Sequence, residues 1–348
     1  MSLQPLTTQP FPIPADVRSL VLVAPGDLGT RTGGYIYDRR IIDGLRALGW
    51  RASISSDLDK VPGGGIALVD GLTWLSANVD LERHQRRIQI VPLVHLPLGL
   101  EVGIHPSEAA RREAVEARAL AVAPLVVATG ALTVDYLADR GIGRERIALV
   151  EPGTDVAPVA RGSGGDVVQI VCAAALTPGK GHAVLIKSLA AVPSRRWLLT
   201  CAGSLDRDPA TVATVRALIE RLRLSGSVTL AGELDAEPLA ALYERSDAFA
   251  LATLRETFGM AVAEAIARGL PVVATSVGAI PRIVGDGGFL VPPDDERALT
   301  AALTRLIDDR ERRGALAEGA RAARNRLRTW EDASAAMAAA LSRVSADD

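Results

Sequence analysis

Residues 255–275 read RETFGMAVAEAIARGLPVVAT, and this stretch indicates the fold around it. A helix is predicted to begin near Gly259 and to end at Gly269, and the apolar PVVAT that follows is typical of a buried strand. The stretch also carries two carboxylates, Glu256 before the helix and Glu264 inside it. A loop, a helix and a strand in this order favour a parallel α/β sheet, in which ligands bind at the carboxyl ends of the strands.

The same alternation of short apolar runs and helical patterns extends over the whole chain. The runs that we predict as parallel strands are 17–24, 66–70, 88–96, 125–129, 146–152, 167–175, 197–202, 227–231, 247–252 and 271–275. Helices are expected between them, for example over 34–48 and 107–121, and again over 295–325 and 330–344.

A segment rich in Gly, Pro and Ser, residues 153–166, separates the two halves and is typical of a linker. We therefore expect two doubly wound, Rossmann-like α/β domains facing a central cleft, at residues 1–160 and 161–329. The C-terminal helix, 330–348, is expected to pack back on the first domain.

Composition excludes several classes of protein. With 348 residues and a formal net charge of -2, the chain is not expected to bind nucleic acid through bulk charge. The N-terminal sequence does not fit a signal peptide, and no apolar run approaches the roughly 18 residues of a membrane span. These features predict a cytoplasmic protein with at most peripheral membrane contact. Cys172 and Cys201 lie in apolar runs and are expected to be buried thiols, because no zinc-ligand spacing is present.

The start of the helix near Gly259 is a candidate phosphate site. Its first amides have no partner within the helix, and glycine allows a ligand to approach the backbone closely. Glu256 either complements the helix dipole or has a functional role. Glu264 is predicted in a helix buried nearly all round and so needs donors, which a ribose diol or an internal Arg or Lys could supply.

These residues resemble a known family. Two glutamates separated by seven residues, followed by Gly-Leu-Pro-Val-Val, are similar to the motif of retaining GT-B glycosyltransferases of family 4, also called glycosyl transferases group 1. The resemblance is strong over the second half and moderate over the first. It implies the GT-B fold and transfer of a sugar from a nucleotide-diphosphate sugar to an acceptor hydroxyl.

 The implied reaction retains the anomeric configuration and needs no metal or other cofactor, and its donor is expected to be a UDP- or GDP-sugar.

The resemblance also assigns roles to residues of this chain. Glu256 would contact hydroxyls of the donor sugar, Glu264 would hold the ribose, and Lys180 would bind the diphosphate. His95 would lie at the reacting sugar, so that His95, Glu256 and Lys180 form the catalytic set. The remaining donor-binding positions implied by the motifs are Gly33, Gly34, Gly232, Glu233, Phe258, Gly259 and Met260.

Each of these roles has a simpler alternative. Lys180 could be a solvated loop lysine, although Gly179 and Gly181 on either side favour a phosphate ligand. A histidine at the end of an apolar strand, such as His95, is more often structural than functional. The acceptor is unknown, and we expect the first domain to bind it near Arg39, Asp70 and Glu101.

One position departs from the family pattern. An arginine that pairs with the donor diphosphate in the family is replaced here by Ala175, and Arg282 is a candidate for restoring the lost charge. Ala175 keeps open a nucleotide-sugar-binding protein without turnover, and the shared fold keeps open a nucleotide-sugar epimerase.

Further alternatives are less well supported by the residues. The loop over 26–34 lacks the G-x-G-x-x-G pattern of an NAD site. The Asp-x-Asp triplets at 57–59 and 206–208 fit the pattern of metal-dependent GT-A glycosyltransferases, but matches of only three residues are common by chance. Glu256 and Glu264 could form a glycosidase pair, but a carboxylate within the helix suits a ribose better than an anomeric carbon.

Overall fold

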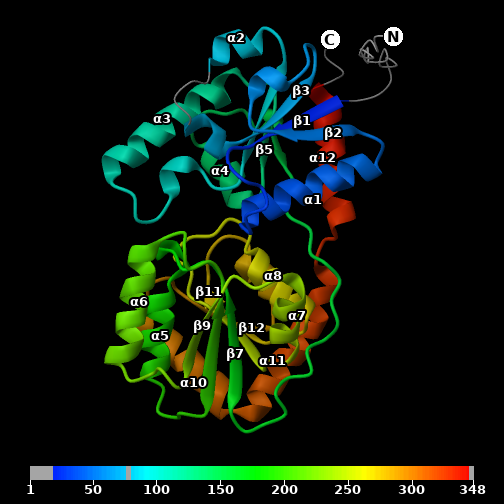
Figure 1. Cartoon of the computed structure of the whole chain (residues 1–348). Helices are drawn as coiled ribbons and strands as arrows, with labels where there is room; N and C mark the ends of the chain where they lie inside the picture. Colours follow the sequence, from blue (N-terminus) through cyan, green and yellow to red (C-terminus); the bar gives the residue numbers. More distant parts are fainter. Residues whose placement is uncertain (1–18, 76–79, 345–348) are drawn as a thin grey trace, which may run out of the picture.

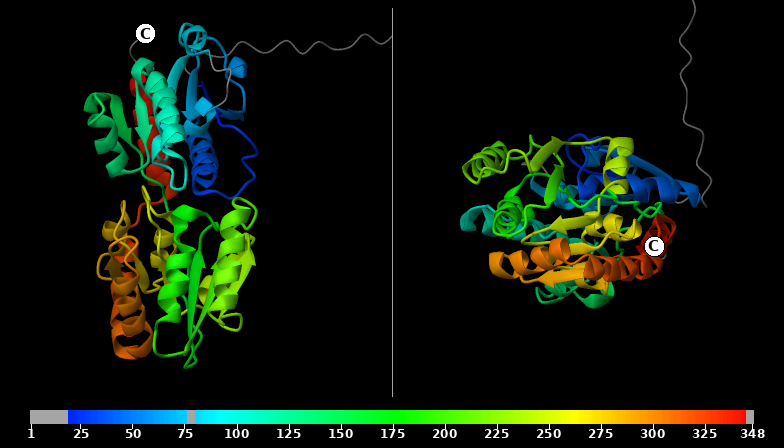
Figure 2. Two further views of the ribbon diagram at one scale, coloured as in Figure 1. Left: turned by 90° about the vertical axis from the view of Figure 1, so that its left-hand side faces the viewer. Right: turned by 90° about the horizontal axis from the view of Figure 1, so that it is seen from below.

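The computed structural model describes residues 19–75 and 80–344. The N-terminal segment that argues against a signal peptide, and the last four residues of the predicted C-terminal helix, lie outside these ranges. Two α/β bodies are stacked one above the other, each built around its own parallel sheet (Figures 1 and 2).

The first sheet has six parallel strands, and five of them form from apolar runs; β1, β3, β4 and β5 are almost wholly buried, whereas the edge strand β6 is partly exposed. In spatial order the strands are β2 (Arg51–Ser55), β1 (Ser19–Val23), β3 (Ile66–Asp70), β4 (Gln89–Val94), β5 (Val126–Ala128) and β6 (Ile147–Leu149). The helices of this body are α1 (Gly33–Ala47), α2 (Leu81–Gln85), α3 (Pro106–Val122) and α4 (Ala131–Ala138).

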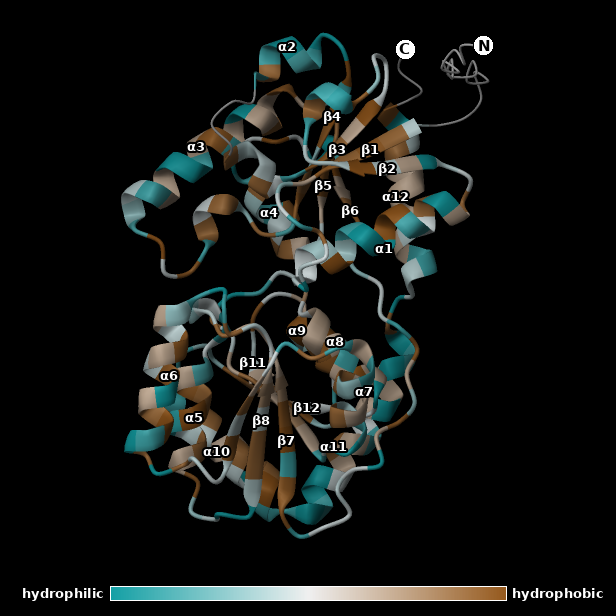
Figure 3. Ribbon diagram, viewed as in Figure 1, coloured by the Kyte–Doolittle hydropathy of each residue, from teal (hydrophilic) through white to brown (hydrophobic). Residues whose placement is uncertain are grey.

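The second sheet also has six parallel strands. In spatial order they are β12 (Gly288–Val291), β11 (Val272–Thr275), β10 (Ala248–Leu251), β7 (Val168–Ala173), β8 (Trp197–Ala202) and β9 (Val228–Gly232). Its helices are α5 (His182–Ala190), α6 (Pro209–Arg221), α7 (Ala236–Glu244), α8 (Met260–Ala267), α9 (Ile280–Val284), α10 (Glu296–Asp308) and α11 (Arg310–Ala323). Figure 3 shows hydrophobic colouring along these strands and mixed colouring on the helices around them, as expected for a sheet covered on both faces.

The last helix, α12 (Trp330–Val344), leaves the second body and packs against α1 of the first. Trp330, Met337 and Leu341 are buried in one cluster with Tyr37 and Ile41 of α1. In Figure 1 the red α12 accordingly lies beside the first sheet, although it follows the second in the sequence.

Two edge strands were not predicted from the sequence. β2 reads RASIS and is largely exposed, so it has no apolar run to reveal it. β12 is a four-residue edge strand that is only partly buried. The predicted helical region over 295–325 is confirmed, and it consists of two helices, because Asp309 ends α10 and caps α11 by accepting a hydrogen bond from the Arg312 amide.

Candidate functional site

A salt bridge at the carboxyl edge of the second sheet joins Lys180 and Glu256. Lys180 ends a short 3-10 turn, Pro178–Lys180, after β7, and Glu256 lies in the loop between β10 and α8. The Lys180 Nζ donates to Glu256 Oε2 over 2.7 Å, and both side chains are partly buried. The two residues predicted to bind the diphosphate and the sugar are therefore adjacent.

Glycines hold both loops in shape. Gly181 has φ +67°, and a Cβ there would lie 1.9 Å from the carbonyl oxygen of Ala252, so the turn that carries Lys180 requires glycine. Gly259 caps α8 with φ +100°, and a Cβ there would lie 2.9 Å from Ile280. The predicted helix start at Gly259 and Met260 is confirmed.

Glu264 lies one turn inside α8, and its surroundings differ from the prediction. The helix is not buried all round: Met260, Ala261, Glu264 and Arg268 form a partly exposed stripe along it. Glu264 Oε2 accepts a hydrogen bond from the hydroxyl of Tyr243 over 3.2 Å. Burial raises the pKa of Glu264, while Arg268 and the Tyr243 hydroxyl act in the opposite direction. The carboxylate thus has an internal donor and still reaches the surface.

In the first body, His95 follows β4 and lies between two carboxylates. Its Nε2 is 3.1 Å from Asp38 Oδ1 and 3.4 Å from Asp70 Oδ2. Burial alone would lower the pKa of His95, but the charges of Asp38 and Asp70 and the Asp38 hydrogen bond raise it overall. Burial raises the pKa of Asp70 to about 6, against the opposing effect of His95. This cluster favours a protonated imidazole.

Asp38 is the member of this cluster that the sequence did not reveal. It lies within α1, is fully buried, and its Oδ2 has no hydrogen-bond partner among the described residues. A charged residue inside an amphipathic helix is normally read as solvent-facing, and only its distance from His95 identifies its place. Asp70, predicted on the acceptor side, belongs to the same cluster.

The glycines that begin α1 connect the two clusters. Gly34 lies against the imidazole of His95, where a Cβ would come within 3.2 Å of the ring. Gly33 faces α8, with the Met260 sulfur 3.7 Å from the position of a Cβ. Met260 packs against the hydrophobic clusters of both bodies. The first-body glycines predicted to face the donor therefore lie at the junction with the helix predicted to bind it.

A contact between the two bodies also lies just after β9. Arg31 donates from Nη1 to the Leu234 carbonyl over 2.7 Å, and its Nη2 pairs with Asp235 at 3.0 Å. Nearby, Gly232 and Glu233 line an open pocket of about 370 Å³. Leu205, Asp206, Pro209, Val212, Ala213 and Arg216 complete its lining.

Other predicted residues lie apart from these clusters. The Phe258 side chain lines a different pocket of about 200 Å³, with Glu151 and Arg282. Arg39 makes a long 3.5 Å hydrogen bond to the Thr30 carbonyl, and Glu101 pairs with Arg112 of α3. The contacts of these two residues give no sign of an acceptor site.

The contacts of Arg282 do not show that it replaces the arginine that the family has at the position of Ala175. Arg282 lies on α9, and its Nη2 pairs with Glu151 of the first body at 2.5 Å. Arg207, in the loop between β8 and α6, is a different candidate. Its charge lowers the pKa of the Tyr35 hydroxyl, which burial and the charges of Asp70 and Asp38 raise overall. The exposed Arg207 guanidinium makes no hydrogen bond or ion pair with another residue that the structure describes.

Within residues 19–75 and 80–344, no helix combines the length and the apolar character needed to cross a membrane.

Comparison with known proteins places this geometry in a family. Residues 158–323 match the family model described as Glycosyl transferases group 1. The second body thus matches this family over nearly its whole length. The match covers the Lys180 loop, the pocket at Gly232 and the whole of α8.

Relatives with curated names are also glycosyltransferases. The chain is 32% identical over 272 residues to the D-inositol 3-phosphate glycosyltransferase of Paenarthrobacter aurescens, covering 70% of this chain and 65% of that protein. It is 30% identical over 231 residues to the MMP alpha-(1->4)-mannosyltransferase of Mycolicibacterium hassiacum, covering 64% and 55%. The matched part thus spans less than two thirds of the length of these relatives.

Solved structures confirm the GT-B fold. Sucrose-phosphate synthase from Thermosynechococcus elongatus superposes with a TM-score of 0.80 at 22% identity, covering 95% of this chain and 100% of that chain. HepE of Anabaena, solved in complex with UDP and glucose, superposes with a TM-score of 0.73 at 20% identity, covering 94% and 99%. The likeness over both bodies shows that the first body, which the family match does not cover, completes the same fold.

Proposed function

We propose that the chain is a retaining glycosyltransferase that moves a sugar from a nucleotide-diphosphate sugar to an acceptor hydroxyl without a metal ion. The observation that carries the proposal is the contact between Lys180 and Glu256 beside the first turn of α8. A cation, a carboxylate and free helix amides at one point suit a diphosphate joined to a sugar.

The leaving diphosphate gains negative charge as the glycosidic bond breaks. Lys180 and the amides at the start of α8 are fixed donors for that charge, so a metal ion is not required. When the diphosphate takes the Lys180 ammonium as its partner, Glu256 becomes able to accept hydrogen bonds from sugar hydroxyls. The change of partner couples donor binding to the placement of the sugar.

The rest of the donor fits the remaining predicted residues. The ribose would bind Glu264 on the partly exposed stripe of α8, and the base would lie against the pocket at Gly232 and Glu233. HepE has been solved with UDP-glucose, and this supports a UDP-sugar as the first donor to test, with GDP-sugars next. The expected compartment is the cytoplasm.

His95 would act from the first body. Because its Nε2 is bound by Asp38, the imidazole has Nδ1 left for a substrate hydroxyl. Asp38 and Asp70 then hold the ring in place and favour its protonated form. Attack would take place on the face of the sugar from which the diphosphate leaves, as retention requires.

Nucleotide release measured with UDP-, GDP- and ADP-sugars in the presence of a chelator tests the proposal. Release that D-inositol 3-phosphate accelerates would support transfer, and this acceptor is chosen from the names of relatives. The anomeric configuration of the product, determined by NMR, tests retention. Absence of binding by every nucleotide sugar would overturn the proposal.

The same assay separates the two other functions. An epimerase would change the sugar without releasing nucleotide. A binding protein would hold the donor without releasing it, and Ala175 is the observation that favours this alternative.

A further inference from the structure

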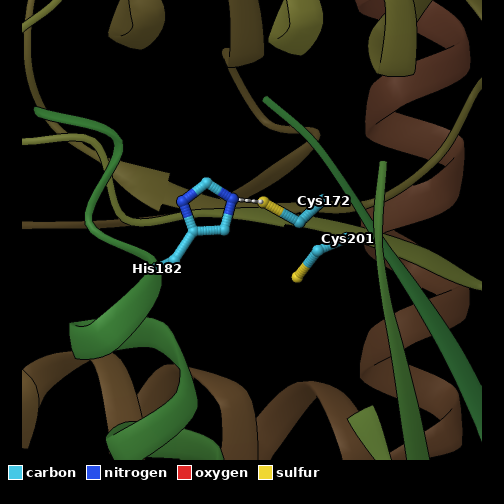
Figure 4. A group of neighbouring side chains, drawn as sticks. All are labelled: Cys172, His182 and Cys201. Carbon is cyan, nitrogen blue, oxygen red and sulfur yellow. Dashed lines mark hydrogen bonds between the residues drawn. The ribbon is translucent and has the colours of Figure 1, made fainter. Parts of the chain in front are cut away.

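The core of the second body contains a cluster of metal-binding side chains away from the sugar chemistry. Cys172 lies on β7 and Cys201 directly opposite it on β8, in register in the parallel ladder. His182 is the first residue of α5. The two thiol sulfurs and an imidazole nitrogen lie within 4.8 Å of one another. Figure 4 shows both sulfurs on the side of the strands where the imidazole lies.

The sequence predicted buried thiols, and both cysteines are indeed fully buried. Their surroundings are not wholly apolar, however, because the Cys172 sulfur is 3.7 Å from His182 Nε2. His182 is 2% exposed, and its Nδ1 has no hydrogen-bond partner among the described residues. Nε2 is the nitrogen that faces the sulfurs in Figure 4, so it is the candidate ligand atom, and Nδ1 lies on the far side of the ring.

The spacing fits a thiophilic ion. Around a tetrahedral Zn²⁺, bonds of about 2.3 Å to sulfur and about 2.0 Å to nitrogen place the two ligand atoms about 3.5 Å apart. The observed 3.7 Å between the Cys172 sulfur and His182 Nε2 needs little adjustment to reach that value. Two thiolates and one imidazole are a ligand set that selects Zn²⁺ or Cu(I) over Mg²⁺ or Ca²⁺.

We propose that Cys172, Cys201 and His182 form a structural site for a soft metal ion such as Zn²⁺. Binding replaces the two thiol protons, which leave to solvent, and joins β7, β8 and the start of α5 through one ion. His182 follows Lys180 by two residues, so the ion also fixes the end of the loop that carries the proposed diphosphate ligand. The site is separate from sugar transfer, in which the ion takes no part.

Cobalt binding tests the site without any assay of transfer. The full chain is reduced, denatured, stripped with a chelator and refolded with Co²⁺, because the three ligands are buried and entry into the folded protein would be slow. We expect one ion per chain, with thiolate-to-cobalt charge-transfer absorption that Zn²⁺ abolishes. Since the chain has only two cysteines, the band intensity counts how many of them bind.

Variants identify the ligands. Cys172→Ser, Cys201→Ser and His182→Gln should each weaken Co²⁺ binding at least about tenfold. Loss of a residue that only orients a ligand already weakens metal binding about tenfold or more, and loss of a ligand itself should cost no less. His105→Gln, which removes an exposed histidine, and Val171→Ala, which opens the same core without removing a ligand, should bind Co²⁺ like the wild type.

Two results would overturn the proposal: refolded wild type without a thiolate band, or Co²⁺ affinity unchanged in both cysteine variants. If a cysteine variant fails to fold, the intensity of the thiolate-to-cobalt band in the wild type tests the site instead. An intensity that corresponds to fewer than two thiolates per ion contradicts the proposed ligand set. None of these readouts depends on sugar transfer, so failure here leaves the proposed glycosyltransferase activity untouched.

Discussion

The Lys180 ammonium and the Glu256 carboxylate lie 2.7 Å apart although 76 residues separate them in the sequence. Their loops follow two neighbouring strands, β7 and β10, and parallel strands bring such loops to one edge of the sheet. The pair unites the proposed diphosphate ligand with the proposed sugar ligand, and each residue restrains the other before a donor binds.

Removing the charge of Lys180 should impair transfer more than removing a charge on the surface. We expect Lys180→Ala to lower kcat by about 10²–10³, the usual effect of losing one donor to a developing anion. Lys187→Ala is the matched control, since Lys187 pairs with Glu296 on the surface. Steady-state kinetics of both variants check the prediction, and equal losses would contradict it.

Substitution of Glu264 and substitution of Glu256 should affect nucleotide affinity differently. Glu264→Gln is expected to weaken both free nucleotide and sugar nucleotide about tenfold, because a ribose hydrogen bond to a charged group contributes about 1.5–3 kcal/mol. Glu256→Ala should weaken only the sugar nucleotide. Calorimetric titration with UDP and UDP-glucose measures both, and an equal loss of UDP affinity in the two variants would exclude the assigned roles.

Much of this arrangement follows from the sequence, and the parts that do not have physical reasons. Buried central strands such as β3 and β8 show themselves as apolar runs, and Gly259 marks the start of α8. The edge strand β2 is missed because its side chains are largely exposed.

Contacts between distant segments are harder to foresee. The imidazole of His95 meets Asp38 only because α1 packs across the end of β4, and no local pattern reports this. The partners of Arg282 and His182 also come from elsewhere in the chain, Glu151 from the other body and Cys172 from β7. Residue types can suggest chemistry, but only packing decides which groups meet.

Asp38 should act as a positioning residue for His95. We expect Asp38→Asn to lower kcat with little change in the KM for the donor, because the variant loses a charge that favours the protonated imidazole. As the pH rises, kcat of the variant should fall at a lower pH than kcat of the wild type. Asp43→Asn, on the exposed side of α1, is the control. A lower kcat with an unshifted pH profile would indicate a merely structural role.

Asp70 should make stability depend on pH. Its pKa rises from 3.8 to about 6 on folding, so the native state holds more protons than the unfolded state between these values. Stability therefore falls as pH rises through this window. The raised pKa of His95 adds a second loss of stability at higher pH, as the pH rises from the ordinary histidine pKa through the raised one. We compare the free energy of unfolding of Asp70→Asn with that of the wild type at two pH values. The difference, variant minus wild type, should be larger at pH ~7.5 than at pH ~4.5 by about 1–3 kcal/mol. Thermal unfolding at both pH values measures the difference, and a difference that is constant with pH would contradict the assignment.

Arg207 should supply part of the positive charge that Ala175 cannot. Its guanidinium has no partner among the described residues, yet its charge reaches the Tyr35 hydroxyl on the other side of the cleft. We expect Arg207→Ala to weaken UDP-glucose binding about tenfold and to make the remaining affinity less sensitive to salt, since one charge pair with the diphosphate is lost. Arg221→Ala, at the exposed end of α6, is the control. If the two variants bind UDP-glucose equally well at low salt, Arg207 does not contact the donor, and the second body would hold the diphosphate with Lys180 and the α8 amides alone.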